Sequence, residues 1–118
     1  MSIPGAADAN VSQEKLTSYL LNLTHPIGGS KARWFYSLGY SAHDPEQLST
    51  DLRLALMCGT VLEVKSNAYG VKYVVSGQML TPSGIEARVM TVWIVTGDHP
   101  APRLVTAFPA KEDEHERI

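Results

Sequence analysis

Residues that could transfer protons and bind an anion gather in one short segment, residues 25–39, with the sequence HPIGGSKARWFYSLG. An imidazole gains and loses a proton near neutral pH, so His25 is the first candidate for acid–base chemistry. Pro26 disfavours helical geometry at His25, which we therefore expect at the end of the preceding element. The glycine pair that follows allows a tight turn. The segment predicts a histidine held beside the start of a helix.

The start of that helix is a predicted anion site. Ser30 is placed to cap a helix over residues 31–38, whose first backbone N–H groups form the positive end of the helix dipole. Lys31 and Arg33 add two cations, and no carboxylate occurs between residues 15 and 43. Helix N-termini bind anions where such groups converge. A connector turn with solvated cations is the alternative interpretation.

Size and charge limit the class of protein. The 118 residues are 44% hydrophobic and 19% charged, which is typical of one soluble globular domain. The net charge of −2 argues against nucleic-acid binding through the overall field, so any basic patch must be local. The single cysteine, Cys58, excludes an internal disulfide and fits a reducing compartment. The sequence has no membrane-length apolar run and no signal peptide, so we expect a cytoplasmic domain or a piece that is delivered by something else.

The chain divides into three predicted parts. Residues 1–10 are rich in small side chains and are expected to be flexible, residues 11–110 form a single domain, and residues 111–118 form a charged tail. His115 in that tail lacks the paired spacing of metal ligands. We therefore expect no metal site, and no motif predicts a cofactor.

Three helices are expected before the first strand. The first follows a cap at Asn10 or Ser12, the second covers residues 31–38, and the third begins at Pro45 after the cap Asp44. Gln47 is expected to complete a capping box in the third helix, and Gly59 to end it. The predicted apolar faces are Leu16, Tyr19, Leu20 and Leu23 in the first helix and Leu48, Leu52, Ala55 and Leu56 in the third.

After the third helix the apolar period changes from that of a helix to that of a strand. Residues 60–65, 71–80, 85–96 and 103–108 are rich in Val, Thr, Ile and aromatic side chains, with turn signals between them. Short loops between consecutive strands predict an antiparallel meander. The fold class is therefore α+β, with about three N-terminal helices packed on one face of a four-stranded sheet.

The register of the central hairpin decides which side chains share a face. A turn at TPSG pairs Leu80 with Ile85, which directs Val75 and Met90 toward the helices and places Arg88 on that side near the hairpin end. A slip of one residue in the last pairing would reverse the assignment there. The face away from the helices is predicted to hold Glu63, Lys65, Lys72, Thr91, Trp93 and, if the last hairpin pairs Trp93 with Thr106, Thr106.

Four stretches of the chain resemble a family of small, uncharacterised bacterial domains. They are HPIGGSKARWFYSLGY, GVKYVVSGQMLTPSG, VMTVWIVTG and PRLVTAFP, and they match the patterns HPxGxxKAxxFxxLGF, KYxVxGxLxxPxG, VxTVWI and PRLVTAYP. The resemblance spans roughly residues 16–109. It departs from the pattern at Phe108, where Tyr is common, and at Gly29, which widens the glycine turn. Some members look like the toxin of a toxin–antitoxin pair.

The wider layout is similar to the barnase, EndoU, colicin and RelE group of metal-independent ribonucleases. That resemblance implies that the RNA 2′-hydroxyl attacks the adjacent phosphate while the protein moves protons and stabilises charge. The predicted catalytic residues are His25 as acid or base, Lys31 and Lys72 on the phosphate, and Thr106 as a hydrogen-bond donor. The predicted substrate-binding residues are Arg33, Arg88, Thr91 and Trp93, with Trp93 stacking a base.

Two classes of function stay open at this point. The first is the ribonuclease-like domain, with RNA and a small antitoxin-like protein as partners. The second is a protein-interaction module without enzymatic activity, either an inactive relative or a partner-binding domain that uses the predicted Trp93 face. His25 is then a capping or core histidine. Neither interpretation involves a membrane, and the oligomeric state is not predicted.

Overall fold

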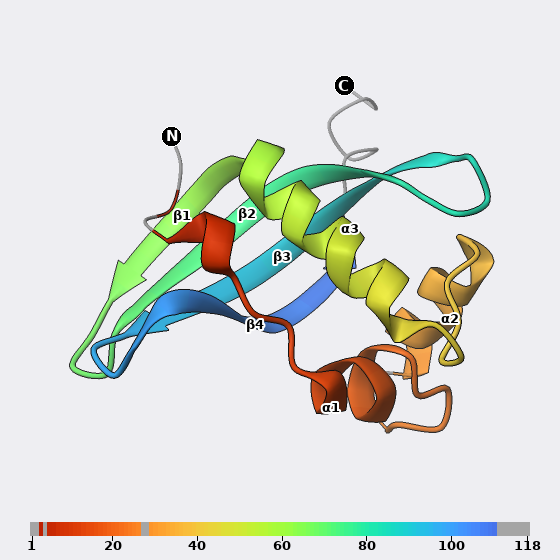
Figure 1. Ribbon diagram of the computed structural model, residues 1–118, viewed down its shortest axis with the longest axis horizontal. Helices are drawn as coiled ribbons and strands as arrows, with labels where there is room; N and C mark the ends of the chain where they lie inside the picture. The colour runs from red at the N-terminus through yellow and green to blue at the C-terminus, as the bar shows by residue number, and fades with distance from the viewer. Residues whose placement is uncertain (1–2, 4, 27–28, 111–118) are drawn as a thin grey trace.

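The computed structural model describes residues 3, 5–26 and 29–110. Its strands form one antiparallel sheet in the order β1-β2-β3-β4, which confirms the predicted α+β fold and meander (Figure 1). None of the helices in these ranges is long and apolar enough to cross a membrane. The elements are η1 (Ala6–Asp8), α1 (Gln13–Lys15), η2 (Leu16–Leu20), α2 (Gly29–Ser37), α3 (Pro45–Cys58), β1 (Thr60–Ser66), β2 (Val71–Leu80), β3 (Glu86–Thr96) and β4 (His99–Pro109).

The helix α3 lies directly on the sheet and crosses it diagonally (Figure 1). A Cβ atom at Gly77 of β2 would lie only 2.5 Å from the carbonyl oxygen of Ala55, so a glycine is needed for this close approach. The helix ends at Gly59 as predicted. Its predicted apolar face, Leu48, Leu52, Ala55 and Leu56, is buried.

The first helix is shorter than predicted and changes character within its length. Ser12 is the cap, because its hydroxyl accepts a hydrogen bond from the Lys15 backbone N–H at 3.1 Å. Asn10 instead forms a bridge with Arg103 of β4. The five residues of η2 continue the helix as a π-helical turn. Since this turn ends at Leu20, the prediction that Leu23 belongs to the apolar face is wrong, and Leu23 is 48% exposed.

The predicted cap at Ser30 and the predicted capping box at Gln47 are also wrong. The helix α2 begins at Gly29, so Ser30 lies inside its first turn and does not precede it. The glycine turn before it falls partly outside the described residues. In α3, Asp44 is the N-cap residue but its side chain makes no cap hydrogen bond, and the Gln47 amide donates to Asp51 one turn later.

The hairpin between β2 and β3 is one residue out of the predicted register. Leu80 pairs with Glu86, and Val75 pairs with Thr91. The backbone N–H and the hydroxyl of Thr81 both donate to the Ile85 carbonyl oxygen, at 3.2 and 2.6 Å, which holds Ile85 in the loop. A slip of one residue turns every side chain of a strand to the opposite face.

This slip corrects the predicted positions of Thr91 and Trp93. Both lie on the helix-facing side and are 0% exposed, so the prediction of an exposed aromatic platform is wrong. The Trp93 indole N–H donates to the Thr91 hydroxyl at 2.7 Å, and that hydroxyl donates to the Val75 carbonyl oxygen at 3.3 Å. Burial of a large indole with its N–H satisfied favours the observed register.

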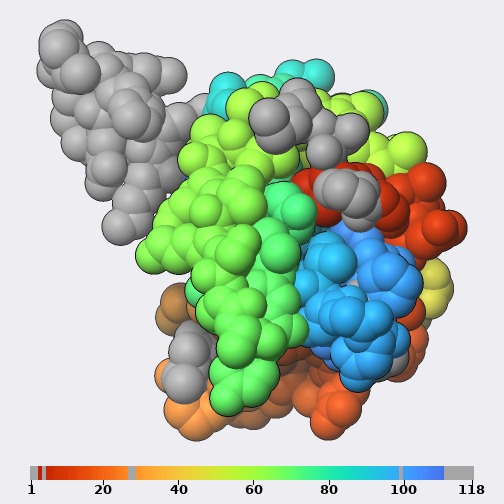
Figure 2. All heavy atoms as spheres, turned by 90° about the vertical axis from the view of Figure 1, so that its left-hand side faces the viewer, coloured from red at the N-terminus to blue at the C-terminus, as the bar shows by residue number. Residues whose placement is uncertain are grey.

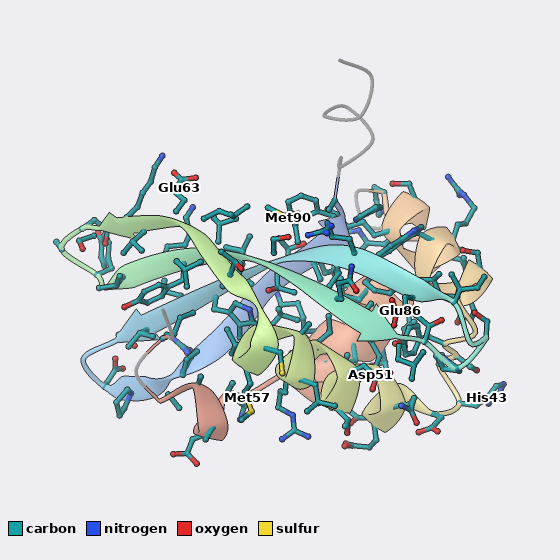
Figure 3. All side chains as sticks on the ribbon, turned by 90° about the horizontal axis from the view of Figure 1, so that it is seen from above. His43, Asp51, Met57, Glu63, Glu86 and Met90 are labelled. Carbon is teal, nitrogen blue, oxygen red and sulfur yellow. The ribbon has the colours of Figure 1, made fainter. Side chains whose placement is uncertain are left out.

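The open face of the sheet, opposite α3, carries the side chains that the slip moved outward. Figure 3 shows Glu63 and Met90 on this face and Met57 and Asp51 on the helix side. Arg88 lies here and not on the apolar side as predicted, because it pairs with Gln78. Glu63 and Lys65, which form an ion pair at 3.2 Å, and Lys72 lie on the predicted face. Thr106 also lies on its predicted face. The prediction paired it with Trp93, but Trp93 faces the helices, and Thr106 pairs instead with Val92, which lies on the open face.

The two ends of the domain differ in what the structure describes. Ile3 and Ala9 are buried in the core, so part of the segment expected to be flexible packs against the domain. The predicted charged tail, residues 111–118, lies outside the described residues. Figure 2 shows the hairpin loop that joins β1 to β2 beside the loop that joins β3 to β4.

A buried polar cluster joins α3 to the segment before it. The Tyr40 hydroxyl donates to a carboxylate oxygen of Asp51 at 2.6 Å, and both residues are buried. Burial raises the pKa of the Tyr40 phenol far above its usual value of 10, and the bond to Asp51 and its negative charge raise it further. Folding therefore favours the protonated phenol, and this contribution to stability is lost as pH rises above about 10.

Tyr40→Phe is expected to lower the free energy of unfolding by about 1–3 kcal/mol at neutral pH, because Asp51 loses a buried donor. The difference in free energy of unfolding between Tyr40→Phe and wild type should become smaller above about pH 10. At that pH Tyr40 ionises in the unfolded wild-type chain, which lowers the stability of wild type but not of the variant. Urea denaturation at both pH values measures this. Tyr69→Phe, at a ring that is 82% exposed, is the control and should match wild type. An equal loss at both pH values would contradict the linkage to Tyr40.

Candidate functional site

The side chain of Tyr19 contacts three predicted site residues, two at its hydroxyl and one at its ring. The Lys31 ammonium of α2 donates to the Tyr19 oxygen at 2.8 Å. The hydroxyl of Thr106 in β4 lies 3.1 Å from the same oxygen. The ring of His25 lies edge-on to the tyrosine ring, with centroids 5.1 Å apart. The chain thus brings η2, the following loop, α2 and β4 together around one phenol.

Local structure explains why Tyr19 reaches this position. It lies in the π-helical turn η2, between the buried Leu16 and Leu20. Such turns change the direction of side chains that follow and are frequent at functional sites. Tyrosine also combines an apolar ring with a polar tip, so the ring packs at the core boundary while the hydroxyl reaches the edge of the sheet.

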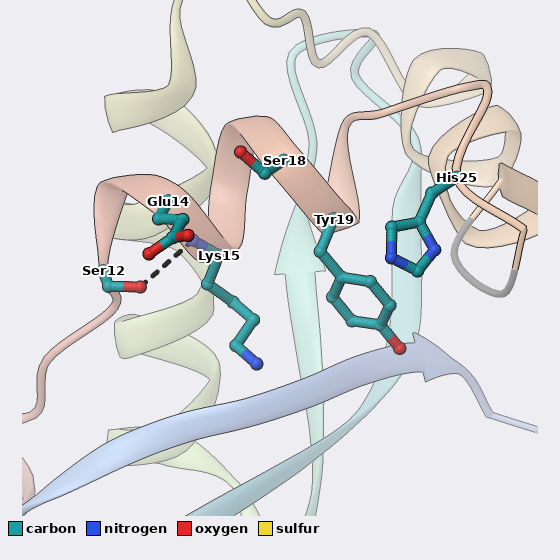
Figure 4. Close-up of a pocket in the computed structure, with 6 residues that line it drawn as sticks. All are labelled: Ser12, Glu14, Lys15, Ser18, Tyr19 and His25. Carbon is teal, nitrogen blue, oxygen red and sulfur yellow. Dashed lines mark hydrogen bonds between the residues drawn. The ribbon is translucent and has the colours of Figure 1, made fainter.

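An open pocket of about 340 Å³ lies beside this cluster. Figure 4 shows the Tyr19 ring next to the His25 imidazole, with the phenol oxygen directed toward β4. The pocket is wide enough for a small polar group such as a phosphate, and its lining is polar. The lining residues are Ser12, Glu14, Lys15, Ser18, Tyr19 and His25.

The charges around Tyr19 stabilise its deprotonated form, the negatively charged phenolate. The ammonium groups of Lys15 and Lys31 each lie 5.3 Å from the centre of the tyrosine ring. Burial alone raises the pKa of Tyr19, but hydrogen bonds from Lys31 and Thr106 and the charges of Lys31 and Lys15 lower it. The net pKa lies below the usual 10. Glu14 is a carboxylate on the same pocket wall.

The structure therefore brings together His25, Lys31 and Thr106 of the four predicted catalytic residues. Lys72 is exposed on the same face of the sheet as Thr106 and, like Lys31 and Thr106, is not among the residues that line the pocket. Unlike those two, it does not hydrogen-bond to the Tyr19 oxygen. Two strand spacings separate β2 from β4, so Lys72 lies about 10 Å or more from Thr106. It could contact an extended ligand but not the group held at Tyr19.

The predicted substrate-binding residues are dispersed. Arg33 is exposed on α2, and Arg88 on the open face donates to the Ser76 hydroxyl at 3.4 Å. Thr91 and Trp93 are buried in the core and cannot reach a ligand, so their predicted contact role is wrong. Across the described ranges, no group of three or more His, Cys, Asp or Glu side chains is placed to hold a metal ion.

Tyr19 and Lys15 are the site residues that sequence reasoning missed. The sequence predicts an apolar helix face for Tyr19, because its spacing matches that of the neighbouring leucines. One signal could have separated it from them, since a buried tyrosine hydroxyl needs a partner and a leucine does not. Lys15 precedes that face and had no predicted role.

Comparison with known proteins assigns the chain to a family. Residues 2–111 match the sequence profile described as a domain of unknown function, DUF6883. The chain is a DUF6883 domain. The expected membership of an uncharacterised family is thereby confirmed at that level, and the link to ribonucleases stays a prediction. No curated protein sequence matches this DUF6883 domain significantly.

A solved structure shares the fold of this DUF6883 domain. It is a chain of the "Contact-dependent growth inhibition toxin - immunity protein complex from Klebsiella pneumoniae 342". The two superpose with a TM-score of 0.70 at 16% sequence identity, over 91% of this chain and 97% of the other. At this identity the likeness establishes a common fold across nearly the whole domain.

Proposed function

We propose that this DUF6883 domain is a metal-independent endoribonuclease, active in the cytoplasm as the toxin of a toxin–antitoxin pair. The observation that carries the proposal is the convergence of His25, Lys31 and Thr106 on the Tyr19 phenol beside an open pocket. The common fold with a chain from a toxin–immunity protein complex supports the toxin role. The pocket would take a phosphate of the RNA backbone.

The reaction needs a base for the 2′-hydroxyl, an acid for the leaving oxygen, and positive charge on the phosphate. In the proposed reaction, the His25 imidazole takes part in proton transfer. Lys31 and Lys15 stabilise the charge that develops on the phosphate, and the Thr106 hydroxyl orients the groups around Tyr19. Lys72, Arg33 and Arg88 would contact the RNA strand farther from the scissile bond. A small antitoxin-like protein would cover the pocket.

The alternative of a non-enzymatic interaction module has less support. The form of it that binds a partner through the predicted Trp93 face requires an exposed aromatic platform, and the Trp93 side chain is buried. The cluster at Tyr19, in contrast, combines proton-transfer groups with cations. We therefore favour the enzyme.

Incubation of the purified full chain with total RNA in a metal chelator tests the proposal. Wild type should cleave RNA, and His25→Ala should reduce the rate by about 10²–10⁴-fold, the usual contribution of a general acid or base. His43→Ala, at an exposed histidine that does not line the pocket, is the matched control and should cleave like wild type. Intact RNA after incubation with folded wild type would refute the ribonuclease function.

A further inference from the structure

We propose that Tyr19 is the general acid of the reaction, donating its phenolic proton to the departing 5′-oxygen, with His25 as the base. This assignment rests on the ribonuclease function proposed above. It adds a catalytic residue to the predicted set and gives Lys31 and Thr106 a definite task. Their hydrogen bonds to the phenol oxygen become the means by which the proton is released.

The first step in the argument is position. Tyr19 and His25 both line the pocket, and their rings are in edge contact at 5.1 Å. Cleavage through the 2′-hydroxyl requires two proton-transfer groups that act on the same phosphate, one for the attacking oxygen and one for the leaving oxygen. Tyr19 and His25 are two residues of this kind on one pocket wall, with the Tyr19 hydroxyl directed toward β4 (Figure 4).

The second step is the hydrogen bonding of the phenol. The Lys31 ammonium can only donate, so its 2.8 Å bond stabilises the oxygen most strongly when the proton has left. The Thr106 hydroxyl, at 3.1 Å, can donate to the same oxygen. These two groups stabilise the phenolate that proton donation would create, which makes Tyr19 a stronger acid than a solvated tyrosine.

The third step is the charge that faces Tyr19 from each element around it. Lys15 comes from α1 and Lys31 from α2, both at 5.3 Å from the ring, and His25 lies in the loop between them. Glu14 on the pocket wall opposes them with one negative charge. The net effect lowers the pKa of the phenol below its usual 10, so Tyr19 gives up its proton more readily than a solvated tyrosine.

The proposed step balances. The His25 imidazole accepts the proton of the 2′-hydroxyl as the bond from the 2′-oxygen to phosphorus forms. The bond from phosphorus to the 5′-oxygen breaks, and that oxygen receives the Tyr19 proton. The products are a 2′,3′-cyclic phosphate and a free 5′-hydroxyl. His25 then returns its proton to the Tyr19 phenolate through solvent, which restores both groups.

Tyr19→Phe tests the assignment because it removes only the hydroxyl. It should lower kcat/KM by about 10²–10⁴-fold and abolish the fall in rate at alkaline pH that Tyr19 deprotonation causes in wild type. Tyr69→Phe is the matched control and should behave like wild type. If wild type cleaves RNA and Tyr19→Phe cleaves equally well, the assignment of Tyr19 fails and the ribonuclease function stands. If wild type cleaves no RNA, the function itself fails.

Two further variants distinguish two roles of Tyr19, that of a general acid and that of a purely structural link between the helices and β4. Lys31→Met and Thr106→Val break the same hydrogen bonds but keep the phenol. If Tyr19 is the acid, both should retain the alkaline fall in rate and move it to higher pH, because each loses a group that lowers the Tyr19 pKa. If Tyr19 is only a structural link, both variants should lose activity to the same extent as Tyr19→Phe, and all three should have a lower melting temperature than wild type. That result would overturn the proposal.

An optical titration gives a readout that does not depend on cleavage. The near-ultraviolet absorbance of tyrosinate in wild type, minus that in Tyr19→Phe, follows the ionisation of Tyr19 alone. We expect this ionisation at lower pH than that of a solvated tyrosine, and at higher pH in Lys31→Met. Identical titration of wild type and Lys31→Met would overturn the role given to Lys31.

Discussion

Bacterial cells that express this chain without a partner are expected to stop growing, and His25→Ala is expected to restore growth. A toxin that cleaves RNA blocks protein synthesis at low abundance. Loss of the proposed proton-transfer group should reduce the cleavage rate by about 10²–10⁴-fold, enough to raise the count of surviving colonies by orders of magnitude. Colony counts after induction measure the effect.

His43→Ala serves as the control in the same cells and should remain as toxic as wild type, since this exposed histidine does not line the pocket. Immunoblots for equal soluble protein separate relief of toxicity from loss of the chain. Free growth of cells that hold folded wild-type protein and intact RNA would refute the toxin role.

Trp93→Ala is expected to lower the free energy of unfolding by about 3–5 kcal/mol, the usual effect of truncating a large core aromatic. The indole is 0% exposed and packs within the core cluster between the sheet and the helices. Its removal also leaves the Thr91 hydroxyl without the indole donor. Because domains of this size are stable by only about 5–15 kcal/mol, the variant should unfold at much lower urea concentration.

Tyr69→Ala provides the matched control, since it removes an aromatic ring that is 82% exposed. Its free energy of unfolding should stay within about 0.5 kcal/mol of wild type. Circular dichroism during urea denaturation measures both variants. If Trp93→Ala changed the free energy of unfolding as little as Tyr69→Ala, the indole would lie outside the core, on the open face that the register deduced from sequence predicts.

Sequence periodicity was sufficient for the fold class, because a helical period and a strand period differ and change abruptly at Gly59. The strand ends were within a few residues of those in the structure. Register was not predictable from the same pattern, because β3 carries apolar side chains on both faces. The hydrogen bonds of Thr81 to Ile85, which add a residue to the loop, decided it.

The candidate site was predictable only in part. Residue type and spacing predict His25 and Lys31, the expected register predicts Thr106, and the resemblance to ribonucleases gives their catalytic roles. The structure brings the three together through Tyr19, which the helical pattern places in the core. Helical spacing places Tyr19 with its leucine neighbours, and only the π-helical turn and the position of β4 reveal where its hydroxyl points. Tertiary contacts of this kind cannot be deduced from spacing along the chain.

The bond between Tyr19 and Thr106 joins residues that are 87 positions apart in the sequence. The pocket residues are made early in synthesis, but the strand that carries Thr106 is the last element that the structure describes. A ribosome that is still translating β4 therefore holds a chain whose site is incomplete. The proposed activity would begin only after that strand has emerged from the ribosome, so the order of synthesis itself delays assembly of the site until β4 has been made.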